Sequence, residues 1–146
     1  MQNEKKHLNT VMNLAESAVA LCKKVWKIEL DYTLGSLGCI DEAIEKMREF
    51  DNPDQKEISF ALVCLGCYAG EVIIRHSGGA WLDEVDANGL PVGLKAGSVT
   101  TNPIKKTFRR YREGEEHVIL HYAACTIVVS STFQNQEPAN LSEKPG

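Results

Sequence analysis

The feature that most constrains the fold of this chain is its apolar segment, residues 58–74, in which Glu71 is the only charged residue. Asp54 precedes the segment as a favourable helix N-cap, and Glu57 stands three residues later, as in a capping box. We therefore predict a helix from Gln55 to His76. Because this helix is apolar on most of its faces, other elements must surround it, and it forms the centre of the core.

Two glycines, Gly66 and Gly70, lie four residues apart within the predicted central helix. Glycine lowers helix propensity, but its missing side chain allows another backbone to come close. We expect the closest helix crossing at these two positions.

Three segments outside the central helix carry amphipathic patterns. Residues 8–27 have apolar side chains at three- and four-residue spacing, and residues 41–51 do the same before a proline ends the pattern. Between them, residues 28–32 alternate as in a short extended piece. A later helix begins at Asn102-Pro103, a favourable N-cap followed by proline in the first turn, and closes at Gly114.

A small β-structure is predicted directly after the central helix. Gly78-Gly79 ends that helix, and residues 80–85 and 90–94 are candidate strands joined by a turn at residues 87–89. Residues 117–131 are rich in Val and Ile, which favours a strand, whereas Glu115 and Glu116 suit a helix start; of the two we favour the helix.

These elements predict an α+β fold, a predominantly helical single domain with a small β-hairpin or meander after a central buried helix. The domain covers residues 1–132. Residues 133–146 are polar, lack periodicity and carry two prolines, so we predict a flexible C-terminal tail.

Charge and cysteine content limit the cellular setting. The formal net charge of −4 is mild and gives no general argument for binding nucleic acid or anionic membranes. The five cysteines are odd in number and most have apolar neighbours, which indicates reduced thiols and a cytoplasmic protein. No secretory signal is visible at the N-terminus, and the glycines and Glu71 within the apolar segment favour a buried helix over a membrane span. We expect no cofactor.

Two further motifs have spacings known from metal or redox sites. Cys64 and Cys67 form a CxxC pair, but the pair lies in the middle of the predicted helix and lacks a second ligand pair, so small core residues are the favoured interpretation. His117 and His121 are four residues apart, but no third ligand accompanies them, so we expect no metal site.

A polar strip runs along the central helix and includes Tyr68, Glu71 and Arg75. The spacing of Glu71 and Arg75 is that of a favourable i, i+4 ion pair. A structural ion pair is one interpretation of the strip, and a ligand-binding site is the other.

The helix after Asn102-Pro103 is strongly basic, and its basic surface consists of Lys105, Lys106, Arg109, Arg110 and Arg112. Phe108 and Tyr111 have the spacing of inward-facing residues, so we do not expect base stacking, and an acidic protein is a better partner than nucleic acid. A solvated face is the simpler interpretation. Pairing with the acidic residues 41–57 of the same chain would leave no site.

The residues Gly70-Glu71-Val72-Ile73, Arg75, Gly78-Gly79 and Trp81 form a GEVIxRxxGGxW pattern. This pattern resembles that of small uncharacterised bacterial proteins of the kind carried by mobile gene cassettes. The resemblance brings no established activity. It implies that Glu71, Arg75 and Trp81 lie in one neighbourhood.

Three functional hypotheses follow. The first is a non-catalytic binding module for a partner protein or small ligand, with a cleft lined by Tyr68, Glu71, Arg75 and Trp81. The second is an enzyme that uses Glu71 as acid or base, although no catalytic motif is present. The third is an interaction protein, such as a homodimer or an immunity or antitoxin-like accessory protein.

Overall fold

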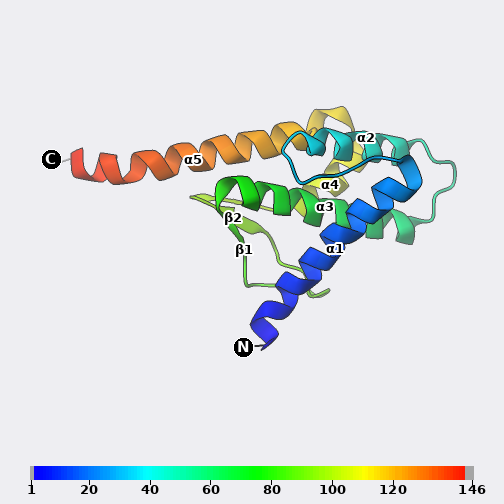
Figure 1. The fold of residues 1–146 in the computed structure, drawn as a ribbon, viewed down its shortest axis with the longest axis horizontal. Helices are drawn as coiled ribbons and strands as arrows, with labels where there is room; N and C mark the ends of the chain where they lie inside the picture. Colours follow the sequence, from blue (N-terminus) through cyan, green and yellow to red (C-terminus); the bar gives the residue numbers. More distant parts are fainter. Residues whose placement is uncertain (1, 144–146) are drawn as a thin grey trace.

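The computed structural model describes residues 2–143, with the side chains of residues 6–116 and 118–131. The described residues form a mostly helical single domain with a small antiparallel sheet (Figure 1). Its elements are α1 (Gln2–Trp26), α2 (Ser36–Arg48), α3 (Gln55–Ser77), β1 (Ala80–Trp81), β2 (Leu94–Ala96), β3 (Val99–Thr101), α4 (Pro103–Glu113), the 3-10 turn η1 (Glu115–His117) and α5 (Ile119–Glu143). The predicted α+β fold is confirmed.

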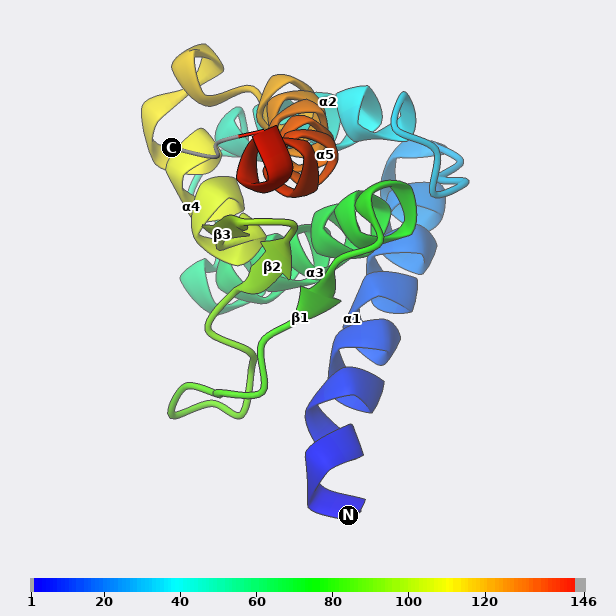
Figure 2. The same ribbon diagram turned by 90° about the vertical axis from the view of Figure 1, so that its left-hand side faces the viewer.

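Helix α3 is the central element. The Asp54 side chain accepts hydrogen bonds from the backbone N–H groups of Lys56 and Glu57, and Gly78 ends the helix in the left-handed conformation with a φ of 75°. Figure 2 shows α1 on one side of α3, α4 on the other, and α2 and α5 above it. The helix is long and apolar enough to cross a membrane, but 67% of its most apolar stretch is buried inside the fold. The predicted central buried helix is therefore confirmed.

The two glycines of α3 make room for different neighbours. A Cβ atom at Gly66 would lie 2.6 Å from the Cα of Ile104, so the first turn of α4 passes directly against α3. A Cβ at Gly70 would lie 2.2 Å from the indole ring of Trp81. The expected close helix crossing is present at Gly66, whereas Gly70 receives an aromatic side chain from β1.

The sheet is smaller and later in the chain than predicted. Its strands have the order β1-β2-β3 and pair antiparallel, with Trp81 opposite Leu94 and Leu94 opposite Thr101. The predicted strands at residues 80–85 and 90–94 do pair antiparallel, but regular strand covers only β1 at the start of the first and Leu94 of β2 at the end of the second, with an isolated bridge between Val85 and Pro91. Strand β3 was not predicted.

Helix α2 begins earlier than its sequence pattern indicated. The predicted start was Asp41, but the helix begins at Ser36, whose backbone N–H donates to the Thr33 hydroxyl at 3.2 Å. Gly38, interpreted as part of a connector, lies inside the helix, where the side chain of Leu120 packs nearby. The extended piece at residues 28–32 does not form a strand.

Helix α5 confirms the helical alternative for the last apolar segment. Its first turn is held by Asp41 of α2, whose carboxylate accepts the backbone N–H groups of Ile119 at 2.7 Å and Leu120 at 3.0 Å. The helix then continues to Glu143, where the sequence predicted a tail without regular structure from residue 133. Sequence patterns missed this part of α5, because residues 133–143 lack apolar periodicity and contain Pro138, a residue that disfavours helix. The domain boundary at residue 132 stays a prediction.

Candidate functional site

A cavity of about 300 Å³ opens between α1, α3 and the loop that connects α1 to α2. We call it the Glu71 cavity. Three different segments contribute ionisable side chains to its wall. The lining residues are Met12, Ala15, Glu16, Tyr32, Glu71 and Arg75.

Tyr32 reaches the cavity because a buried tyrosine holds its backbone. Tyr32 has a φ of 62°, in the left-handed region that non-glycine residues seldom adopt. Its N–H donates to the Tyr68 hydroxyl at 2.8 Å, and the ring centroids of the two tyrosines are 4.6 Å apart. The Tyr68 hydroxyl also bonds with the Ser36 hydroxyl at 2.6 Å. Tyr68 is therefore a buried support that fixes the position of Tyr32.

The Tyr32 hydroxyl bridges the cavity wall to α1. It donates a hydrogen bond to the carboxylate of Glu16. Burial raises the pKa of the Tyr32 phenol, and the Glu16 carboxylate raises it further because it accepts this proton and is negatively charged. The phenol thus stays neutral and keeps Glu16 oriented at the cavity.

Glu71 is held by Trp81 and not by Arg75. The indole Nε1–H of Trp81 donates to Oε2 of Glu71 at 2.8 Å. Trp81 is only 7% exposed, with its ring against Gly70. This contact places the half-buried Glu71 carboxylate at the edge of the cavity.

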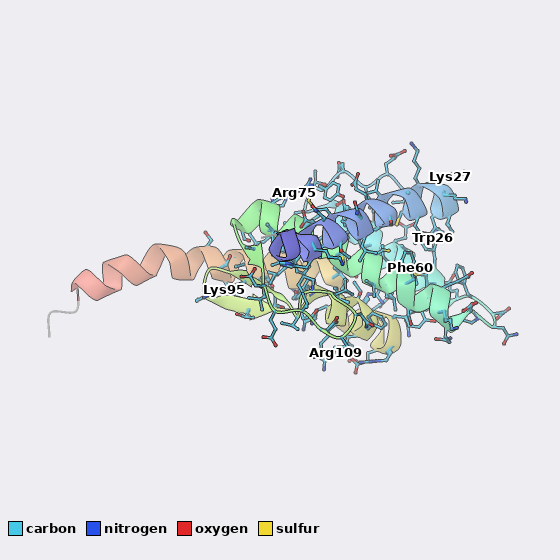
Figure 3. All side chains as sticks on the ribbon, turned by 90° about the horizontal axis from the view of Figure 1, so that it is seen from below. Trp26, Lys27, Phe60, Arg75, Lys95 and Arg109 are labelled. Carbon is cyan, nitrogen blue, oxygen red and sulfur yellow. The ribbon has the colours of Figure 1, made fainter. Side chains whose placement is uncertain are left out.

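Arg75 lies over the face of Tyr32, with its guanidinium carbon 3.8 Å from the ring centroid. This is a cation–π contact, and the side chain remains exposed. Figure 3 places Arg75 beside α1, at the C-terminal end of α3. Among the described side chains no ion pair joins Glu71 to Arg75, so the predicted i, i+4 pair is wrong. Glu71 instead bonds to Trp81, and Arg75 instead contacts Tyr32.

The predicted site is therefore divided between two layers. Glu71 and Arg75 line the cavity, whereas Tyr68 and Trp81 are buried behind it and support the lining residues. Glu16 and Tyr32 were missed. Glu16 resembles any exposed residue of an amphipathic helix, and Tyr32 fitted a strand-like alternation, so neither carried a local signal.

The cavity combines groups of both charges. Glu16 and Glu71 supply carboxylates, and Arg75 supplies a guanidinium. In the described part of the chain, Oε1 of Glu71 accepts no hydrogen bond and the Arg75 N–H groups donate none. Such a site can accept a protonated amine and an anionic group from one small molecule.

The predicted basic surface loses one of its members. Arg110 is only 3% exposed, and its guanidinium contacts Asp41 at 3.1 Å and Glu45 at 3.4 Å. It is buried because the Asp41 carboxylate on α2 faces it. Part of the basic helix is thus neutralised within the chain, as the alternative interpretation expected.

The other basic residues border a separate hollow of about 690 Å³ along α4. They are Lys105, Lys106, Arg109 and Arg112. Arg109, labelled in Figure 3, pairs with Glu113 at 3.2 Å, and Lys106 lies 5.2 Å from the Tyr122 ring centroid. Since these two cations already have partners and Asp86 also lines the hollow, its charge is mixed.

The CxxC cysteines behave as core residues. Cys64 and Cys67 are buried, and burial raises the pKa of their thiols to about 11 and about 12. Redox catalysis needs a thiolate at neutral pH, and these environments disfavour it. Among the described residues no group of three or more His, Cys, Asp or Glu side chains is placed to hold a metal. The His117 side chain lies outside the described part, and His121 is exposed.

The chain matches no protein-family model, no curated protein and no solved structure. The resemblance to cassette-borne bacterial proteins therefore stays a prediction.

Proposed function

We propose that this protein is a non-catalytic binding module that holds a small zwitterionic ligand in the Glu71 cavity. The ligand's protonated amine binds the carboxylates of Glu16 and Glu71, and its anionic group binds Arg75. The observation that carries the proposal is that Glu71 and Arg75, four residues apart on α3, bond to Trp81 and Tyr32 instead of to each other. The second carboxylate oxygen of Glu71 and the N–H groups of Arg75 therefore remain able to bond to a ligand in the same cavity.

The arrangement is held in place before a ligand enters, which lowers the entropic cost of binding. Glu71 is fixed by the buried Trp81. Arg75 rests on Tyr32, and Tyr32 is anchored through its own backbone to Tyr68. Two carboxylates against one guanidinium give the lining a net negative charge, so an amine is the obligatory group of the ligand.

Free amino acids and their blocked derivatives test this proposal. We expect at least one amino acid to raise the melting temperature of the full chain and to bind in calorimetry, and its N-acetyl derivative to bind at least tenfold more weakly. The amide derivative, which lacks the carboxylate, loses the contact with Arg75 and also binds more weakly.

Site variants and matched controls complete the test. Glu71→Gln and Arg75→Met each lower the affinity at least tenfold, whereas Glu84→Gln and Arg109→Met, on other surfaces, leave it unchanged. Equal binding of blocked and free ligands, or equal loss in the control variants, would contradict the proposal. So would the absence of binding throughout a panel of acidic, basic and neutral amino acids at millimolar concentration.

The other hypotheses stay predictions. An enzyme that uses Glu71 as acid or base is compatible with the position of Glu71 at a cavity, but among the described side chains no Ser, Cys or His lines that cavity to act with it. A cytoplasmic location, a homodimer and an immunity or antitoxin-like role rest on the sequence alone.

A further inference from the structure

A further hollow lies at the C-terminal end of α1, where the helix stops beside the start of α3. Its volume is about 290 Å³, and we call it the Trp26 groove. Trp26 and Phe50 stack along it, with ring centroids 6.5 Å apart and planes at 22°. The apolar part of its lining includes Val25, Trp26, Phe50 and Ile58.

The apolar lining is partly exposed to solvent. Phe50 is 46% exposed, and Val25 is similarly exposed. Phe60, one turn beyond Glu57 on α3, is 57% exposed but is not one of the residues that line the groove. Single exposed apolar residues are ordinary, but a cluster around a groove indicates a contact surface.

Within the described part of the chain, all charged residues that line the groove are acidic. They are Asp51, Asp54 and Glu57. Asp54 also caps α3, and the positive end of the α3 dipole, roughly half an elementary charge, offsets only a small part of the three carboxylates. Lys23, on the same turn of α1, is paired with Glu29 at 3.7 Å and does not line the groove. The groove therefore has an apolar floor and a negatively charged rim.

We propose that the Trp26 groove docks a basic segment of a partner protein. A large apolar side chain of the segment packs between the Trp26–Phe50 stack and Ile58, and flanking Lys or Arg residues pair with Asp51 and Glu57. A second copy of this chain, docked symmetrically through the same groove, would bring two acidic rims together, which costs free energy. The complementary charge therefore selects a different, basic protein. The proposal is independent of the Glu71 cavity.

A displayed library of random linear peptides, sorted against the full chain, tests the proposal. We expect the selected peptides to carry Lys or Arg on both sides of a Trp, Phe or Leu, and their affinity to fall as salt screens the charges. The double substitution Asp51→Lys with Glu57→Lys lowers the affinity of these peptides at least tenfold. Val25→Ser, which changes no charge, lowers it at least threefold.

The matched control is the double substitution Glu84→Lys with Glu116→Lys, which makes the same charge change at two exposed residues away from the groove. It changes the affinity less than twofold. Circular dichroism and melting temperature verify that all variants fold.

Several results would overturn the proposal. They are a library that yields no binders, selected peptides without basic residues, and binding that both double variants weaken equally. Sedimentation that shows a dimer of the wild type and a monomer of the Asp51→Lys, Glu57→Lys variant would assign the groove to a second copy instead.

Discussion

The indole N–H of Trp81 donates to the Glu71 carboxylate at 2.8 Å, and this one bond joins β1 to the C-terminal half of α3. The indole ring itself fills the space left open by Gly70. The bond orients the carboxylate at the edge of the Glu71 cavity. Packing of the sheet and geometry of the candidate site thus depend on the same side chain.

The first prediction separates these two roles of Trp81. Trp81→Phe keeps an aromatic ring over Gly70 but removes the hydrogen bond to a charged acceptor. We expect the free energy of unfolding to fall by about 2 kcal/mol, measured by urea denaturation. Trp26→Phe, at a half-exposed position without such a bond, changes it by less than about 1 kcal/mol. Equal effects of the two substitutions would show that the bond adds nothing to stability.

The second prediction compares two helical glycines. A Cβ at Gly70 would lie 2.2 Å from the Trp81 ring, whereas a Cβ at Gly38 would lie 3.7 Å from the Leu120 side chain, an ordinary contact. Gly70→Ala therefore forces the indole out of place and destabilises the protein by about 1–3 kcal/mol. Gly38→Ala is neutral or stabilises by up to about 1 kcal/mol, because alanine favours helix. Thermal unfolding of both variants checks that Gly70→Ala is the less stable of the two. A Gly70→Ala protein as stable as the wild type would contradict the close packing.

Signals within one short stretch of chain were enough to predict α3 and α4. The N-caps Asp54 and Asn102 bond to their own first turns, and Gly78 ends α3, so each signal acts within a few residues of itself. The start of α2 was misplaced, because Gly38 lowers helix propensity, whereas the burial of Leu37 and Ile40 in the core stabilises the first turns of the helix. Strand β3 forms by pairing with β2, and no local sequence pattern predicts this pairing.

The candidate site was predictable in its α3 residues only. Glu71 and Arg75 stood out as polar residues on an apolar helix, and they do line the cavity. Their expected ion pair failed because Trp81 and Tyr32 compete for them in three dimensions. Arg110 was assigned to the surface by composition, but its environment is set by Asp41, which reaches it from another helix.

The third prediction concerns the buried pair of Asp41 and Arg110. Asp41 accepts hydrogen bonds from Arg110 and from two backbone N–H groups at the start of α5. Asp41→Ala leaves all of these donors without their acceptor, so we expect a loss of about 3–5 kcal/mol. Arg110→Met leaves Asp41 bonded to α5 and costs about 1–3 kcal/mol.

Urea denaturation of the two single variants and the double variant measures the coupling between Asp41 and Arg110. Arg109→Met, which breaks the exposed pair with Glu113, serves as the control and costs less than about 1 kcal/mol. A larger loss for Arg110→Met than for Asp41→Ala would mean that Asp41 does not hold α5.

The fourth prediction is a loss of stability at alkaline pH. Burial raises the pKa of Cys22 and Cys67 to about 12 and that of Cys64 to about 11, from an ordinary value of 9.0. Above pH 9 the unfolded chain releases these protons while the folded chain keeps them. Deprotonation therefore stabilises the unfolded state relative to the folded state. The free energy of unfolding is therefore at its full value below pH 9 and declines as pH rises, by up to about 1.4 kcal/mol per thiol per pH unit.

Urea denaturation at several pH values between 8 and 10.5 measures this slope. Replacing Cys64 and Cys67 together by alanine removes two of the titrating thiols, so the free energy of unfolding declines less steeply with pH, whatever its value at pH 8. Cys125→Ala, at an exposed position, leaves the slope as it is in the wild type. Because the comparison uses slopes, a general weakening of the core by the double substitution does not imitate the result. An unchanged slope in that variant would show that other groups, such as the half-buried Tyr122, whose pKa burial raises to about 12, control the alkaline transition.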